Sequence, residues 1–165
     1  MPELYPPLPP ELVTFAETGV SLLVGTCSLE LVPDCVRGMG LRVWPDACHL
    51  TVILPAATSR ASIANLRANP RLAVTMSHVP SHRTMQAKGP VLAIRDGSED
   101  DRALATRYRE LFADDLALFG QPAANTLRLS IWPCYAVDVE ISVVYAQTPG
   151  PSAGDKLPLA SGLGI

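Results

Sequence analysis

The residues best suited to binding chemistry lie in one short stretch, Thr58, Ser59 and Arg60, directly before a helical pattern. A helix N-terminus offers free backbone N–H groups and the positive end of the helix dipole, which attract anions. A serine hydroxyl and a guanidinium added there would form a phosphate-binding site. A purely structural role is equally open, in which Thr58 or Ser59 caps the helix and Arg60 is solvated.

A second group of polar residues alternates along a predicted strand. Thr84, Gln86 and Lys88 share one face of it, while Met85 and Ala87 share the other. If the polar face is buried, its hydroxyl and amide need hydrogen bonds, and a flat heterocycle with carbonyl and N–H groups would supply them. If the face is exposed to solvent, no ligand is required.

Several familiar sites are missing from the sequence. It has no Gly-x-Gly-x-x-Gly and no Gly-x-x-x-x-Gly-Lys-Ser/Thr phosphate loop, and no His-Glu-x-x-His pair. Its three histidines, His49, His78 and His82, do not lie four residues apart on a helix, so we expect no metal site. The four cysteines form no Cys-x-x-Cys motif and are expected to be reduced, packed thiols.

Composition predicts one ordinary globular domain. The chain has 165 residues, of which 48% are hydrophobic and 18% charged, with a formal net charge of −3. Its basic residues are spread out, so neither nucleic acid nor an anionic membrane is an expected partner. No apolar run approaches the roughly 20 residues of a membrane span, and the N-terminus does not resemble a secretory signal. We therefore expect a cytoplasmic protein.

Hydrophobic periodicity predicts the elements that must position these residues. Helices are expected over residues 11–18, from 58–59 to the Asn69-Pro70 pair, and over 100–119; strands are expected from residue 20, over 32–44, 49–54, 72–76, 83–95 and 127–131, and over 137–145. The longest helix has a capping-box-like start at Ser98 and Asp101 and ends at Gly120.

About six strands with inserted helices, and no regular βαβ alternation, predict an α+β protein with an antiparallel barrel and short peripheral helices. Residues 1–147 would form this domain and residues 148–165 a flexible C-terminal tail.

The order of these motifs resembles the pyridoxamine 5′-phosphate oxidase-related FMN-binding proteins. The likeness covers residues 11–94 and is carried by residues 24–26, 66–70 and 83–89. It implies a split β-barrel that forms homodimers with flavin at the subunit interface.

By the same resemblance, Ser59 and Arg60 would bind the FMN phosphate, and Arg37 would lie near the phosphate or the ring. Thr84 and Gln86 would follow the isoalloxazine edge, and Thr58 and Lys88 complete the candidate site as its neighbours.

The chain departs from the family in places. Ala61 stands where the oxidase has a second basic residue after its Ser-Arg pair, and the arginine-rich C-terminal signature is missing, so vitamin B6 oxidation is not expected. We expect a flavin-dependent oxidoreductase acting on a small molecule, with no acid or base assigned. The alternative is a non-catalytic module that binds flavin, haem or a deazaflavin.

Overall fold

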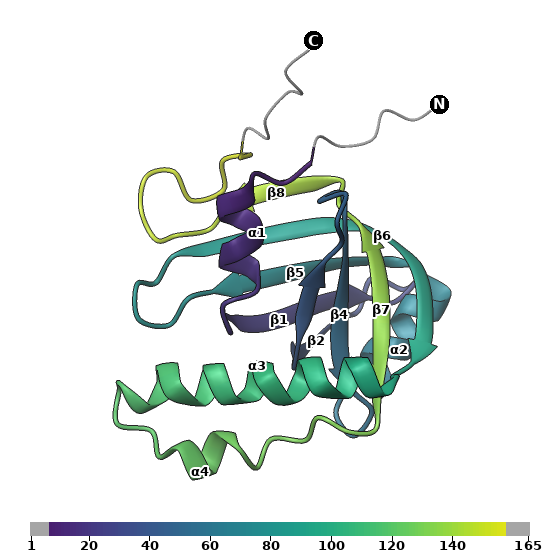
Figure 1. The fold of residues 1–165 in the computed structure, drawn as a ribbon. Coiled ribbons are helices and arrows are strands. Elements are labelled where there is room, and N and C mark those ends of the chain that lie inside the picture. The colour runs from purple at the N-terminus through teal and green to yellow at the C-terminus, as the bar shows by residue number, and fades with distance from the viewer. Residues whose placement is uncertain (1–6, 158–165) are drawn as a thin grey trace.

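The computed structural model describes residues 7–157 of the chain (Figure 1). In chain order the elements are α1 (Pro10–Ala16), β1 (Ser21–Cys27), β2 (Pro33–Gly38), β3 (Leu41–Val43), β4 (His49–Pro55), α2 (Arg60–Ala68), β5 (Arg71–Ser77), β6 (Thr84–Asp96), α3 (Glu99–Ala117), α4 (Ala123–Thr126), β7 (Cys134–Glu140) and β8 (Val143–Ala146).

The strands form an antiparallel sheet in the order β2-β1-β5-β6-β7-β4-β3, with β8 paired to β6. The 13-residue β6 pairs through its first half with β5 and β8 and through its second half with β7. Met39 N donates to Ile53 O at 2.8 Å and Ile53 N to Gly40 O at 2.8 Å, so the link between β2 and β3 also meets β4. The sheet thereby closes into a barrel, which confirms the predicted α+β architecture.

Within residues 7–157 the sheet has eight strands rather than about six, because two predicted strands are each divided. The run 32–44 breaks at residues 39–40. Glycines stand on both sides of the break: a Cβ on Gly38 would lie 3.0 Å from the Leu22 Cβ, and one on Gly40 would lie 3.1 Å from the Ile53 Cγ1. The run 137–145 breaks after Glu140, so that β7 pairs with β4 and β8 pairs with β6.

The predicted strand at 127–131 is wrong. The short helix α4 precedes it, and turns lead from there to β7. Leu127 is 42% exposed, Ile131 is buried, and the Leu129 carbonyl accepts a hydrogen bond from Arg109 of α3 at 3.1 Å. The apolar alternation therefore belongs to a segment that lies along α3, without a strand partner.

Two short helices pack on the barrel. In α1, Leu12 and Phe15 are buried. In α2, Ile63 and Leu66 are buried, and Asn65 Nδ2 donates to Thr26 Oγ1 of β1 at 3.1 Å. Each helix buries one apolar face in the core, as the sequence pattern predicts.

The long helix α3 crosses below the barrel in Figure 1. It begins with the predicted capping box, in which Asp101 N donates to Ser98 Oγ and the Asp101 carboxylate accepts from Ser98 N. Further along, Tyr108 donates its hydroxyl hydrogen to Val20 O at 2.6 Å. Gly19 (φ +78°) lets α3 approach, because a Cβ there would lie 2.5 Å from the Leu111 Cβ.

The segment after β8 differs from the flexible tail expected from residue 148. Ala146 N donates to Asp155 O and Leu157 N donates to Val144 O, both at 2.9 Å, so the chain folds back along β8 as far as residue 157. Residues 158–165 lie outside the described part of the chain.

The four cysteines are free thiols. Cys134 is buried, whereas Cys35 is exposed, so the expectation that all are packed is wrong for Cys35. Among the helices within residues 7–157, none has the length and apolar character needed to cross a membrane.

Candidate functional site

Helix α2 forms one wall of an open hollow of about 440 Å³, here named the α2 hollow, lined by Ala56, Arg60, Ile63, Ala64, Arg67 and Tyr135. The four lining residues from α2 are spaced three, four and seven positions apart and therefore share a helix face. The Arg67 guanidinium lies 6.0 Å from the centre of the Tyr135 ring. The described lining holds two guanidinium groups and no carboxylate, so it suits an anion with an apolar or aromatic part.

The three residues predicted to bind phosphate differ in their exposure to solvent. Thr58 and Arg60 are exposed, but Ser59 is buried and its Oγ donates to Pro55 O at 2.7 Å. Ser59 occupies the N-cap position without accepting a hydrogen bond from the helix. Asp34 also lies beside the first turn, where its Oδ2 accepts from Ser62 Oγ at 2.5 Å. An anion near α2 would therefore meet Arg60 and Arg67 rather than the Ser59 hydroxyl.

The other four predicted residues lie on the outside of the sheet formed by β2, β1, β5, β6 and β8, here named the outer sheet face. The strand register puts one row across it, consisting of Arg37, Leu23, Thr75, Gln86 and Tyr145. The next row runs through Cys35, Gly25, Ala73, Lys88 and Val143. Thr84 lies on the same face at the start of β6, opposite Ser77.

Polar side chains on the outer sheet face are bonded to their neighbours. Arg37 Nη1 donates to Ser21 Oγ at 3.0 Å, and its guanidinium lies 5.2 Å from the centre of the Phe112 ring of α3. Gln86 Nε2 donates to Thr75 Oγ1 at 2.8 Å.

Thr84 and Lys88 have neighbours of their own on this face. Thr84 Oγ1 donates to Ser77 Oγ at 3.0 Å, and Lys88 Nζ lies 5.1 Å from the centre of the Tyr145 ring. Neighbouring strands thus satisfy part of the hydrogen bonding of the Thr84 hydroxyl and the Gln86 amide, for which the sequence analysis suggested a ligand.

A second cationic hollow borders the outer sheet face near the C-terminal end of α2. It has a volume of about 300 Å³ and is lined by Gly25, Thr26, Cys27, Asn69, Arg71, Leu72, Ala73, Lys88 and Gly89. Lys88 belongs to the outer sheet face and Asn69 ends α2, so this hollow lies between them. The structure thus brings Lys88 toward α2, while Thr84 lines a separate hollow beside the C-terminal loop.

Sequence reasoning missed Arg67, Arg71 and Tyr135. Arg67 could have been found, because it follows Arg60 by seven residues on a predicted helix and so shares its face. Tyr135 could not, since only the pairing of β7 with β4, which sets Tyr135 opposite Leu54, brings it to α2.

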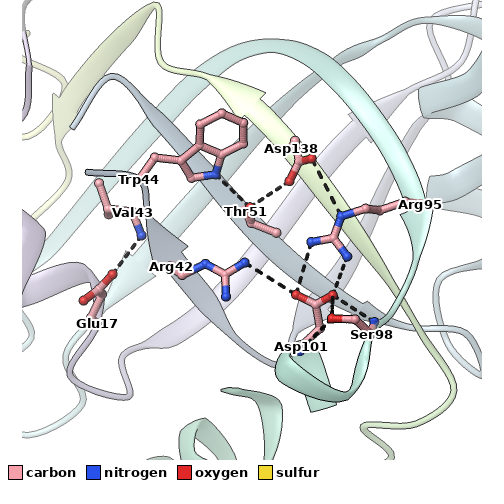
Figure 2. Close-up of polar contacts among 9 residues, drawn as sticks. All are labelled: Glu17, Arg42, Val43, Trp44, Thr51, Arg95, Ser98, Asp101 and Asp138. Atoms are coloured by element: carbon pink, nitrogen blue, oxygen red, sulfur yellow. Dashed lines mark hydrogen bonds and ion pairs between the residues drawn. The ribbon is translucent and has the colours of Figure 1, made fainter. Parts of the chain in front are cut away.

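A cluster of charged residues between α3 and the sheet is already satisfied internally (Figure 2). Burial alone would raise the pKa of Asp101, but hydrogen bonds from Arg95 and Ser98 outweigh it and lower the pKa from 3.8 to about 2. Arg42 Nη2 lies 3.6 Å from Asp101 Oδ1, and Arg95 Nε lies 3.9 Å from Asp138 Oδ2. This carboxylate is a structural anchor rather than a free acid or base.

None of the three histidines lines the α2 hollow or the second cationic hollow. His49 Nδ1 lies 2.6 Å from Asp46 Oδ2, and His78 Nδ1 lies 2.7 Å from Ser81 Oγ. His82 sits in the β5–β6 hairpin with φ +57°. No group of three or more His, Cys, Asp or Glu side chains able to hold a metal occurs within residues 7–157.

One serine motif has no catalytic setting. Residues 150–154 read Gly-Pro-Ser-Ala-Gly, which matches Gly-x-Ser-x-Gly. A nucleophile elbow needs a strand before it and a helix after it, whereas these residues form exposed turns beyond β8.

Comparison with known proteins finds a shared fold. No protein-family model and no curated protein matches the chain. HupZ from Group A Streptococcus is 15% identical with a TM-score of 0.55, covering 89% of this chain and 99% of its own. A candidate pyridoxamine 5′-phosphate oxidase from Lactobacillus delbrueckii is 14% identical with a TM-score of 0.55, covering 85% and 94%.

An F420 reductase is 15% identical with a TM-score of 0.50, covering 79% of this chain and 93% of its own. At these identities the likeness is one of fold. The resemblance to pyridoxamine 5′-phosphate oxidase-like split barrels is thereby confirmed for the fold.

Proposed function

We propose that this chain is a flavoprotein that binds FMN noncovalently and acts as an oxidoreductase on a small molecule. The observation that carries the proposal is the α2 hollow, where Arg60, Arg67 and the Tyr135 ring meet without a carboxylate in the described lining. A phosphate dianion requires such cationic donors, and the protein as a whole carries a net charge of −3.

The residues present fit FMN in kind. Arg60 and Arg67 would hold the phosphate. Arg37, Gln86 and Lys88 would offer donors for the ring carbonyls and nitrogens, and the Thr84 hydroxyl oxygen would offer an acceptor. Thr58 would line the approach, and Ser59 would fix the backbone before α2. Bound FMN would supply the hydride chemistry, while the protein orients and shields it.

We further propose that the functional unit is a cytoplasmic homodimer with the cofactor between its subunits. The outer sheet face would provide the interface, so the phosphate and the ring need not be held by one subunit. Four free thiols suit a reducing compartment.

Flavin titration with matched ligands tests the proposal. FMN and riboflavin differ only by the phosphate, so Arg60→Ala and Arg67→Ala should each weaken FMN binding about tenfold or more, from loss of a charge-assisted hydrogen bond, and leave riboflavin binding unchanged. Quenching of flavin fluorescence measures both affinities. Arg128→Ala, an exposed arginine outside the α2 hollow, is the control.

Three other outcomes would count against it. Equal losses for FMN and riboflavin would contradict the phosphate role of the two arginines. Tight binding of F420 instead of FMN would favour a deazaflavin, the cofactor that the name of one structural neighbour specifies. A Soret band after addition of haemin, with no flavin binding, would favour the haem alternative.

A further inference from the structure

A fourth hollow lies away from the candidate flavin site, between the end of α1, strand β3 and helix α3. It has a volume of about 290 Å³, is here named the α1–α3 hollow, and is lined by Ala16, Glu17, Leu41, Arg42, Leu104, Arg107, Tyr108 and Leu111. None of these residues lines the α2 hollow or lies on the outer sheet face. The two regions can therefore be tested separately.

Five of the eight residues that line the α1–α3 hollow are alanine, leucine or tyrosine, and the other three are charged. Its four residues from α3 are spaced three, four and seven positions apart, so they form one stripe along that helix. Leu104 and Leu111 are half-buried, while Leu41 and Tyr108 are buried behind them. A ligand would find aliphatic and aromatic carbon on several sides.

Arg42 brings unused hydrogen-bond donors to the hollow. Within residues 7–157 its one ion pair is with Asp101, 3.6 Å away, and its side chain is 43% exposed. Figure 2 shows that Asp101 already accepts hydrogen bonds from the Arg95 guanidinium and from Ser98 N and Oγ. An arginine has five N–H donors, so most of those on Arg42 remain available.

Arg107 adds a second guanidinium. It is exposed, and within residues 7–157 its guanidinium forms no hydrogen bond or ion pair. The carboxylate in the lining is that of Glu17, and its Oε1 already accepts a hydrogen bond from Val43 N at 2.8 Å. The lining therefore holds two guanidinium groups against one carboxylate.

We propose that the α1–α3 hollow binds a small amphipathic carboxylate, whose carboxylate contacts Arg42 and Arg107 while its hydrocarbon body packs between Leu104 and Leu111. The size of the ligand follows from the volume. Small-molecule sites start at about 300 Å³, so this hollow takes a short-chain acid rather than a two-chain lipid.

Sodium octanoate is the probe, added to the full chain and followed by ¹H–¹⁵N NMR and calorimetry. Saturable shifts should be confined to residues 16–17, 41–42 and 104–111. Octanol, which has the same hydrocarbon body without the charge, should bind at least about tenfold more weakly.

Variants of an exposed arginine keep the fold intact. Arg107→Ala should weaken octanoate binding about tenfold or more, and Arg107→Glu should abolish it. Arg102→Ala, another exposed arginine of α3 outside this hollow, should leave it unchanged.

Equal affinity for octanoate and octanol, or octanoate shifts spread over exposed leucines elsewhere, would overturn the proposal. So would Arg107→Ala with unchanged affinity. Because no flavin is added, a failure here leaves the FMN proposal intact, and a failure to bind FMN leaves this result standing.

Discussion

A single buried carboxylate, that of Asp101, connects three elements of the fold. It starts α3, accepts hydrogen bonds from Arg95 of β6 and lies 3.6 Å from Arg42 of β3. Its side chain is 0% exposed, so its charge is stabilised by these partners rather than by water. Removing that charge should lower the free energy of unfolding strongly, by an amount that depends on pH.

Replacement of Asp101 by Asn should destabilise the fold by about 2–3 kcal/mol at neutral pH, because Arg95 and Arg42 lose their shared anion. The lowered pKa of Asp101, about 2 against 3.8, sets the pH dependence. A carboxyl with a depressed folded-state pKa contributes fully above its unfolded pKa and loses the contribution as pH falls through the folded one. The difference between wild type and variant should therefore be full above pH 4 and shrink toward pH 2.

Urea unfolding at pH 7, 4 and 2.5 measures this difference. Glu99→Gln is the matched control, since Glu99 lies in the same first turn with a side chain that is 79% exposed. A constant difference at all three pH values would contradict the role given to the Asp101 charge.

At the scale of elements, β6 matters most, because it passes from one half of the split barrel to the other. Gly89 lies just before this passage, where the link from β7 to β8 crosses the strand and Ser142 N donates to Lys88 O at 2.9 Å. A Cβ on Gly89 would lie 1.7 Å from the Glu140 carbonyl oxygen. Only glycine fits without backbone movement.

Gly89→Ala should therefore destabilise the protein by about 2 kcal/mol or more, through overpacking against backbone. Gly25→Ala is the control, since a Cβ there would meet nothing closer than the Ala73 carbonyl oxygen at 3.9 Å. Thermal unfolding of the two variants measures the contrast. Similar melting temperatures would show that β7 and β8 shift without cost.

Local patterns were enough to predict α1, α2, α3 and the barrel class, but not the short helix α4. Helix α3 carries its own signals, a capping box at Ser98 and apolar residues at helical spacing, and these depend on no distant partner. Patterns failed where tertiary contacts decide. The alternation at 127–131 looked like a strand, but the segment that contains Leu129 lies along α3 instead.

The candidate site was predictable only in part for the same reason. The alternation of Thr84, Gln86 and Lys88 placed them correctly on one face of β6. That Arg37 shares this face depends on the pairing of β2, β1 and β5, which no local pattern encodes. Ser59 is buried, and its Oγ donates to Pro55 O instead of capping the helix that it precedes, which its position before a helix does not reveal.

At the scale of the whole molecule, the outer sheet face is the surface through which we propose that two copies of the chain associate. Leu23 lies in β1, between β2 and β5, yet it is 41% exposed. It stands between Arg37 and Thr75 in the row that continues to Gln86. In the homodimer proposed above, a second copy would cover this leucine and the polar side chains around it.

If the outer sheet face joins two subunits, Leu23→Lys should convert a dimer into a monomer, because each copy would bury an unpaired ammonium beside Arg37. FMN affinity should fall in parallel if the cofactor lies between the subunits. Light scattering after gel filtration gives the mass, and Leu118→Lys, at a leucine 73% exposed beyond the end of α3, should remain dimeric. If Leu23→Lys and Leu118→Lys are both dimeric, the outer sheet face is not the dimer interface. If Leu23→Lys is monomeric and its FMN affinity is undiminished, the whole flavin site lies within one subunit.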